Sequence, residues 1–262
     1  MRYILIPKVL TFVLGASISA GCVTTEYNVG THTQDIYFYS TESEINMGRN
    51  IAKKIKSEFE VSSNPYDIKR VDSVVRKILP FIDRQELSYY FYILDSDDKG
   101  KEQINAFSVP GGYVYIFKDL LDMLDEDELA FVLAHEVGHI VSRHHIKRLQ
   151  AVMGSNLLLI ASKAAPSDSN FSGGLSFALA QIISGYSRQD EFNADELAVE
   201  YCESAGFDPR AGIEVLEKLY NYEKENLRPV SYFRTHPYTD QRIRHIKETL
   251  QLSLDVDDYI NY

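Results

Sequence analysis

Two histidines and one glutamate in the middle of the chain have a spacing that suits metal-dependent hydrolysis. In the run LAFVLAHEVGHIVSRHH, His135 and His139 are four residues apart, and Glu136 follows the first histidine. Residues four apart on a helix project from one face, so both imidazoles can reach one zinc ion at about 2.0–2.1 Å. Glu136 would lie beside that ion, where its carboxylate can take a proton from an attacking water. The alternative is a pair of structural histidines, but the surrounding helix is apolar, and polar side chains without partners are costly there.

Such a site needs a third protein ligand that leaves one position open for water. In the segment SRQDEFNADELA, Glu191 and Asp195 are four residues apart, so they also share one helix face. The glutamate can bind the ion, while the aspartate can accept a hydrogen bond from the distal nitrogen of a ligand histidine and fix its tautomer. Spacing alone leaves other candidates for the third ligand, namely Asp190, Glu196 and His145.

Four motifs, in this order, resemble those of a known family. HEVGH, SRQDEFNAD and RTHPYTDQRI, preceded by NAFSVPGGYVYI, are similar to the HtpX-like and CAAX-prenyl-protease-like zinc endopeptidases. These form metallopeptidase family forty-eight of the gluzincin group. The resemblance implies one zinc ion per chain, bound by His135, His139 and Glu191, with Glu136 as the general base. It also implies that Asp195 supports a ligand histidine.

The resemblance further implies a role for His236, in the segment RTHPYTDQRI. In the family, the histidine of the HP motif lies near the metal, where it stabilises the oxyanion or, in some members, binds the zinc as a fourth ligand in a closed state. From the residues alone, a histidine before proline could equally cap the helix that starts there. Arg242 and Arg188 are candidates to line the cleft, and each could equally be an ordinary ion-pair partner.

The remaining histidines have structural interpretations. His144 and His145 come at the end of the helix that holds the motif, where positive charge suits the helix dipole. His145 is six residues after His139, which places it off the ligand face. His32 and His245 are not expected to be ligands.

The segment INAFSVPGGYVYIF, upstream of the motif helix, has a candidate role in substrate binding. Gluzincins commonly hold an extended substrate against a sheet edge through main-chain hydrogen bonds. Asn105, Ala106 and Phe107 would lie at that edge, and Gly111 and Gly112 would allow close approach of the backbone. A plain β-hairpin without contact to substrate is the alternative.

These residues need a scaffold, and the sequence predicts a mainly helical α+β fold. Thr41 and Glu44 are spaced as the capping box of a first helix, and Asn64–Pro65 open a second. The second helix has apolar positions at intervals of three and four: Ile68, Val71, Val74, Val75 and Ile78.

The sheet is predicted from two aromatic and branched segments. SYYFYILDS is typical of a strand, and INAFSVPGGYVYIF predicts two strands joined by a turn. Asp125, with Glu128 three residues later, marks the start of the motif helix. Further helices are expected from Leu175 toward Gly185, from 188 to Gly206, from Asp208–Pro209 and at the end of the domain. We therefore expect a gluzincin zinc-peptidase core, in which an active-site helix packs near a small mixed sheet whose edge faces the cleft.

Composition limits the kinds of protein that this chain can be. Its 262 residues are 45% hydrophobic and 25% charged, which suits one globular domain with a substantial core. The 38 acidic and 27 basic residues include no basic tract, so nucleic acid is not expected as a partner. Cys202 falls in a helical pattern and is expected to be a small core residue.

The N-terminal residues predict export and a lipid anchor. Arg2 and Lys8 lead into the apolar segment 9–18, which is too short to span a bilayer. The segment SISAGC resembles the lipobox of bacterial lipoproteins, in which Cys22 would carry the lipid, although Ser19 stands where leucine is commoner. A cleaved signal without lipid, or an uncleaved anchor, is the alternative.

The expected organisation is a single peptidase domain on a tether. Its parts are a signal peptide over 1–21, a lipid-anchored tether over 22–40, a zinc metallopeptidase domain over 41–252 and a C-terminal tail over 253–262. The apolar segment 149–165 contains Asn156 and Lys163, so we expect a core or docking helix there and not a membrane span. HtpX-type relatives have membrane-spanning helices, whereas this chain is expected to have none after the signal peptide.

Together these features predict a zinc-dependent endopeptidase of the bacterial cell envelope, lipid-anchored and facing the periplasm. Val23, not aspartate, follows the lipidated cysteine, which favours the outer membrane in enteric-type bacteria. The expected substrates are unfolded or misassembled envelope proteins, in a role in protein quality control. The rival hypothesis is a chaperone-like or assembly-factor binding module with gated or rare proteolysis. A weaker third option is hydrolysis of a non-peptide amide.

Overall fold

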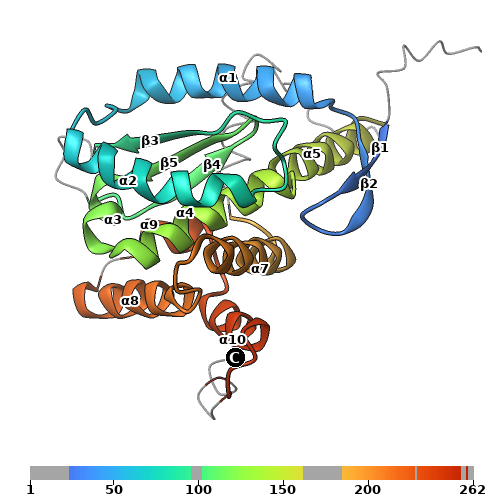
Figure 1. Cartoon of the computed structure of the whole chain (residues 1–262). Coiled ribbons are helices and arrows are strands. Elements are labelled where there is room, and N and C mark those ends of the chain that lie inside the picture. The colour runs from blue at the N-terminus through green and yellow to red at the C-terminus, as the bar shows by residue number, and fades with distance from the viewer. Residues whose placement is uncertain (1–23, 96–101, 162–184, 228, 255–257, 259–262) are drawn as a thin grey trace, which may run out of the picture.

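Helices make up most of the computed structural model, which describes residues 24–95, 102–161, 185–227, 229–254 and 258 (Figure 1). The helices are α1 Thr41–Glu58, α2 Pro65–Ile78, α3 Lys118–Met123, α4 Glu126–Val141, α5 His144–Ala161, α7 Arg188–Ala205, α8 Ala211–Asn226, α9 Ser231–Thr235 and α10 Thr239–Thr249, with a 3₁₀ helix η1 at Leu79–Phe81. The strands are β1 Thr24–Asn28, β2 Thr33–Tyr37, β3 Tyr90–Leu94, β4 Ala106–Val109 and β5 Tyr113–Phe117. These elements confirm the mainly helical α+β class.

A mixed three-stranded sheet separates two apolar layers. Its order is β3-β5-β4, with β5 parallel to β3 and antiparallel to β4, so β4 is an edge strand as predicted. Side chains alternate along β5: Val114 and Ile116 face the main core, whereas Tyr113, Tyr115 and Phe117 face a smaller core shared with α1. In Figure 1, α1 runs along one side of the sheet, and α2 and α4 lie on the other.

The helix α4, which carries the histidine motif, packs against α2, α7, α8 and β4. It begins with the predicted capping box, in which Asp125 and Glu128 each accept a hydrogen bond from the other's main-chain N–H. Its contact with α7 is close because residue 138 is glycine: a Cβ at Gly138 would lie 3.0 Å from the main-chain oxygen of Ala194. The two helices that carry the candidate ligands are therefore near enough for their side chains to meet.

Three details of the first helices differ from the prediction. Ser40, not Thr41, caps α1. Glu44 does not complete a capping box, because its buried carboxylate pairs with Arg84 at 3.0 Å, a partner that local spacing does not reveal. Asn64 caps α2 as predicted, but Ile68 is 47% exposed, while the other four predicted apolar positions of that helix are buried.

The helices after α4 follow the predicted pattern with one shift. α7 ends at Gly206, whose φ of 79° is left-handed, as expected for a helix-terminating glycine. Pro209 lies ahead of α8 and not in its first turn. α8 begins at Ala211, after a turn in which Asp208 accepts a hydrogen bond from the Arg210 N–H at 2.9 Å.

The segment predicted to be a tether contains an antiparallel β-hairpin, formed by β1 and β2. Polar contacts hold it to the domain: Asn28 Nδ2 donates to the Ser142 main-chain oxygen at 2.9 Å, and Glu26 pairs with Arg143 at 2.6 Å. The hairpin lies beside α5 at one end of the molecule (Figure 1). A tether was predicted because this segment has few apolar anchors, whereas polar contacts hold the hairpin, so the ordered structure extends from Thr24 into α1.

Several predictions fall outside the described residues, namely the signal peptide over 1–21, Cys22 and most of the helix expected from Leu175 toward Gly185. Among the helices that the structure describes, none has the length and hydrophobicity to cross a membrane. Cys202 is buried and not in a disulfide, as predicted for a small core residue.

Candidate metal centre and active site

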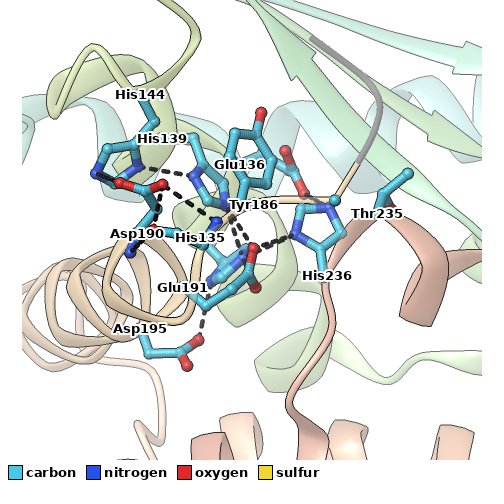
Figure 2. Close-up of polar contacts among 12 residues, drawn as sticks. His135, Glu136, His139, His144, Tyr186, Asp190, Glu191, Asp195, Thr235 and His236 are labelled. Atoms are coloured by element: carbon cyan, nitrogen blue, oxygen red, sulfur yellow. Dashed lines mark hydrogen bonds and ion pairs between the residues drawn. The ribbon is translucent and has the colours of Figure 1, made fainter. Parts of the chain in front are cut away.

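Helices α4 and α7 bring the two motif histidines and Glu191 together in the interior (Figure 2). Nε2 of His135 lies 3.1 Å from Nε2 of His139. Glu191 places Oε1 at 3.5 Å from Nε2 of His139 and Oε2 at 3.5 Å from Nε2 of His135. All three side chains are fully buried. Spacing alone left three other candidates for the third ligand, namely Asp190, Glu196 and His145. All three lie outside this ligand cluster.

A buried carboxylate fixes the orientation of His135. Its Nδ1 donates to Asp195 Oδ1 at 2.9 Å, so its Nε2 presents a lone pair to the cluster. Arg242, also fully buried, donates two hydrogen bonds to Asp195 at 2.7 and 2.8 Å and lies 3.1 Å from Glu191. Burial raises the pKa of Asp195, but Arg242 outweighs burial and the pKa falls below its ordinary value. Arg242 is therefore an ion-pair partner of Asp195 and also borders the cluster through Glu191.

A second imidazole fixes the orientation of His139. Its Nδ1 lies 2.9 Å from Nδ1 of His144, whose Nε2 lies 3.4 Å from Asp190 Oδ1. Burial lowers the pKa of His144 to about 4 against the opposing effect of Asp190, so the ring is neutral near pH 7. One tautomer suits both contacts: His144 Nδ1 accepts from His139, and the N–H at His144 Nε2 lies on the side of the Asp190 carboxylate. His144 lies outside the ligand cluster, in keeping with the structural role predicted for it, but it begins α5 and contacts His139 instead of ending the motif helix.

His144 reaches His139 because α4 does not continue through it. Arg143, between α4 and α5, has a φ of 54°, and this left-handed residue interrupts the helix and changes the direction in which the following side chains point. On one continuous helix, residues 139 and 144 would point about 140° apart. Arginine is not a typical left-handed residue, so the sequence gives little sign of this turn.

The cluster fits a zinc ion. The two hydrogen-bond chains leave the Nε2 lone pairs of His135 and His139 facing each other, and such a pair repels unless a proton or cation lies between them. Glu191 Oε2 is buried and accepts no aligned hydrogen bond from the described residues. Two imidazole nitrogens and one carboxylate oxygen are a donor set typical of catalytic zinc. Burial and the neighbouring histidines lower the pKa of His139, which keeps its ring neutral, as a ligand requires.

Glu136 lies beside the cluster on the same helix. Its Oε2 accepts a hydrogen bond from Ser108 Oγ of β4 at 2.9 Å, and its Oε1 lies 3.1 Å from Nε2 of His236. Burial raises the pKa of Glu136, but His236 and His135 outweigh burial, and the pKa falls below its ordinary value. Glu136 is therefore a carboxylate held in one orientation. Ser108 was not predicted, although a serine within an apolar strand was a signal that could have found it.

His236 lies between the two glutamates. Its Nδ1 is 3.3 Å from Glu191 Oε1 and 3.3 Å from Nε2 of His135, so one of its ligand atoms lies within 4.8 Å of the other three candidate ligand atoms. Burial lowers the pKa of His236, but Glu136 and Glu191 outweigh burial and raise it to about 10. Tyr238, not His236, occupies the N-cap of α10, which removes the helix-capping alternative.

Two further buried side chains pack around His139. The ring of Tyr186 stacks on that of His139, with 3.7 Å between centroids. The Tyr186 hydroxyl lies 2.7 Å from Nε2 of His145, and the same nitrogen lies 2.9 Å from the Ser108 main-chain oxygen. Burial lowers the pKa of His145 to about 3, so this ring is neutral. His145 is a structural contact to β4, and not a charge at a helix end as predicted.

The edge of β4 is partly occupied by the chain itself. The Asn105 main-chain oxygen accepts a hydrogen bond from the Phe117 N–H at 2.9 Å. In an antiparallel pair, every second residue bonds the neighbouring strand, so Asn105 and Phe107 turn their main-chain groups toward β5. The main-chain groups of Ala106 and Ser108 therefore point to the open edge. Ile104, on the same edge, accepts from the Tyr232 N–H at 2.9 Å, and Ser108 O contacts His145. Of Asn105, Ala106 and Phe107, only Ala106 therefore turns its main-chain groups to that edge.

Two other sequence predictions need correction. A Cβ at Gly111 would lie 2.9 Å from the main chain of Ile45, and one at Gly112 would lie 2.2 Å from that of Ser88. These glycines admit a close approach of the protein's own backbone, and both have positive φ. Arg188 does not line the cluster, because it is exposed and donates to Gln241.

His32 and His245 lie away from the cluster, as expected. His32 is exposed and lies 3.3 Å from the Tyr27 hydroxyl. His245 stacks on Phe192 and lies 2.8 Å from Glu196.

A His-Glu-x-x-His helix, a carboxylate from a second helix and a nearby edge strand define the gluzincin class of zinc peptidases. Within that class, this chain belongs to peptidase family M48, whose model matches residues 65–250.

Curated relatives agree with this assignment. The beta-barrel assembly-enhancing protease of Yersinia pestis is 29% identical over 216 residues, covering 78% of this chain and 43% of that protein. The mitochondrial metalloendopeptidase OMA1 of Schizosaccharomyces pombe is 28% identical over 254 residues, covering 93% of this chain and 73% of that protein. Metalloprotease LoiP of Escherichia coli (strain K12) is 23% identical over 250 residues, covering 90% and 93%. The chain thus spans less than half the length of the first of these relatives.

Proposed function

We propose that this chain is a zinc-dependent endopeptidase with one zinc ion per chain. The observation that carries the proposal is the convergence of two imidazole lone pairs, from His135 and His139, on the Glu191 carboxylate, with Glu136 ionised beside them. When bound by these three ligands, zinc supplies a Lewis acid that polarises the peptide carbonyl and acidifies the attacking water. Membership of the M48 family supports the same chemistry.

The proton transfers fall to the chain's own residues. Ser108 holds Glu136 Oε2, which leaves Oε1 directed toward the cluster. We infer that Oε1 takes the proton of the attacking water and later delivers it to the leaving amine. His236 Nε2, 3.1 Å from that oxygen, is the proposed donor to the oxyanion of the substrate.

The proposed substrate is an extended peptide that adds to the edge of β4. The main-chain groups of Ala106 point to that edge and can pair with such a peptide. Asn105 has a supporting role, because its Oδ1 accepts a hydrogen bond from Thr235 Oγ1 at 3.1 Å, next to His236. Ala106 is fully buried, so the peptide binds only after the side chains that cover this edge have moved.

A second candidate function draws on this same closure. His236 contacts both glutamates, and the chain's own groups occupy the main-chain acceptors of Ile104 and Ser108. A closed site of this kind also suits a chaperone-like or assembly-factor module in which proteolysis is gated or rare. Activity decides between the two functions, since both use the same fold and metal.

We propose a place in the bacterial cell envelope, with a lipid on Cys22 and the domain facing the periplasm from the outer membrane. The lipobox-like SISAGC supports the anchor, and Val23 after the cysteine supports the outer membrane. One relative is named for beta-barrel assembly, which supports quality control of unfolded or misassembled envelope proteins, and another is named as a metalloprotease, which supports proteolysis.

The test compares purified wild type with Glu136→Gln on casein and on a peptide panel, with zinc content measured on the same preparations. Glu200→Gln serves as the matched control, because Glu200 is an exposed glutamate on α7. Wild type and Glu200→Gln should cleave in the presence of zinc and stop when a chelator removes it. Glu136→Gln should bind zinc and lose at least about 10³-fold in kcat/KM, since the general base is gone. Equal activity of wild type and Glu136→Gln, with zinc bound in both, would favour the binding module.

A further inference from the structure

The β1–β2 hairpin has its two faces reversed relative to an ordinary surface hairpin, which turns apolar side chains inward and polar ones outward. Apart from the buried ring of Tyr37, the inward side is polar. Asn28 is 3% exposed and is held to the domain by a hydrogen bond to the Ser142 main-chain oxygen. The acidic side chains of the two strands also turn inward, Glu26 to Arg143 at 2.6 Å and Asp35 to Lys147 at 2.7 Å.

The outward side is apolar and uncharged. Tyr27 and Ile36 are 55% and 57% exposed, and Phe38, just after β2, is 59% exposed. The other strand residues that are exposed are neutral, namely Thr25, Thr33 and Gln34. The domain's own core cannot cover this side, because the polar face already contacts the domain. An exposed apolar patch without charge marks an interaction surface.

The position of Cys22 in the sequence indicates that this surface contacts a lipid bilayer. β1 begins at Thr24, and two residues of extended chain reach at most about 7 Å. A lipid on Cys22 would therefore keep the hairpin against the bilayer. Tyrosine and apolar side chains suit the membrane interface, where one part of a ring is wet and the other is not. A chain of net charge −11 can approach anionic lipids most closely with a face that has no acidic side chain.

We propose that the outward face of the hairpin, formed by Tyr27, Ile36 and Phe38, inserts into the interfacial region of the bilayer and docks the peptidase domain on the membrane. This proposal rests on the proposed lipidation of Cys22. The docked hairpin is linked to the metal centre: Asn28 binds Ser142, which follows α4, and Asn193 of α7 binds the Gly30 main-chain oxygen. The domain therefore has one fixed orientation on the membrane instead of swinging on a tether.

The absence of tryptophan from all 262 residues permits a direct test. Ile36→Trp gives the mature protein a single tryptophan at the centre of the proposed contact. Tyr66→Trp is the matched control, because Tyr66 is 83% exposed on α2. Both proteins are purified from membranes and reconstituted into phosphatidylcholine–phosphatidylglycerol vesicles, with and without brominated acyl chains. Intact mass reports whether Cys22 carries a lipid.

The expected result is a shift of Ile36→Trp emission to shorter wavelength and about twofold quenching by brominated lipids, since interfacial side chains lie about 5–10 Å deep. Tyr66→Trp should show neither change. If the mass shows a lipidated protein and both variants stay equally unquenched, docking is wrong and the anchor stands. A blue shift that follows protein concentration and not lipid would assign the surface to a second copy of the chain and overturn docking. A mass without lipid overturns the anchor and the docking that rests on it.

Discussion

The two candidate ligand histidines are supported in different ways. Behind His135 lies Asp195, fully buried and bound twice by Arg242, so its support is a carboxylate in a dry interior. Behind His139 lies the neutral ring of His144 and then Asp190, whose side chain is 32% exposed at the edge of a surface cavity. Both arrangements favour a ligand histidine that is protonated at Nδ1, but only the support of His135 includes a buried charge.

This difference predicts which of the two supports would matter more for binding a metal ion. A carboxylate hydrogen-bonded to Nδ1 orients the ring and also raises the basicity of Nε2, so it strengthens the ligand. A neutral imidazole orients the ring with a weaker electrostatic effect. We therefore expect substitutions of Asp195 and its partner Arg242 to reduce stability or zinc affinity more than substitutions of His144 and Asp190 do.

The largest effect is expected from Arg242→Met. The substitution leaves Asp195 and Glu191 buried without their guanidinium partner, so the free energy of unfolding should fall by about 3–5 kcal/mol. Urea unfolding of zinc-loaded protein measures the change. Arg244→Met is the matched control on the same helix, because Arg244 pairs with Glu248 near the surface and should cost at most about 1 kcal/mol. Equal losses in both variants would contradict the buried role of Arg242.

Next in size is the effect of Asp195→Ala on zinc binding. Loss of the acceptor for His135 Nδ1 should weaken zinc binding by about 10–100-fold, measured by competition with a chromophoric chelator. Asp195→Asn keeps an acceptor without the charge and should fall between wild type and the alanine variant. If Asp195→Asn binds zinc as weakly as Asp195→Ala, the charge and not the hydrogen bond carries the effect.

The contrast between the two supports also explains what the sequence could predict. His135, His139, Glu191 and Asp195 lie on two helices, at spacings of four, and helical periodicity places such pairs on one face without knowledge of the fold. Which carboxylate meets the rings, however, depends on the packing of α4 on α7, and only the family resemblance selected Glu191. Arg242 is 47 residues from Asp195 in sequence, so no local pattern connects them.

The contact of His144 and the β1–β2 hairpin, which the sequence did not predict, share a physical cause. His144 turns toward the site because Arg143 adopts a left-handed conformation, which tertiary contacts impose on it: its guanidinium lies 3.8 Å from the Tyr37 ring and pairs with Glu26. The hairpin was missed for the same reason, because polar long-range contacts hold it and hydrophobic periodicity does not report such contacts. Strands and helices with an apolar face were found, whereas elements fixed by buried polar contacts were not.

A smaller effect is expected from His144→Ala. The variant removes the acceptor for His139 Nδ1 and should weaken zinc binding by up to about 10-fold, less than Asp195→Ala, because the lost partner is neutral. The same chelator competition gives the comparison. His245→Ala is the control, since that histidine stacks on Phe192 at the surface and should leave zinc binding unchanged. A loss larger than that of Asp195→Ala would reverse the proposed order of the two supports.

The smallest effect is expected from Asp190→Asn. Asp190 is partly exposed and 3.4 Å from His144 Nε2, so solvent screens its charge, and the amide oxygen of asparagine is a polar group of the same size facing the ring. Zinc affinity should change by less than about threefold. Asp190 also completes the capping box of α7 with Ser187, so Ser187→Ala, which removes the cap without touching His144, separates a loss of helix stability from a loss at the metal. If Asp190→Asn weakens zinc binding as much as His144→Ala while Ser187→Ala does not, His144 acts through the Asp190 charge, and both histidine ligands then depend on a carboxylate.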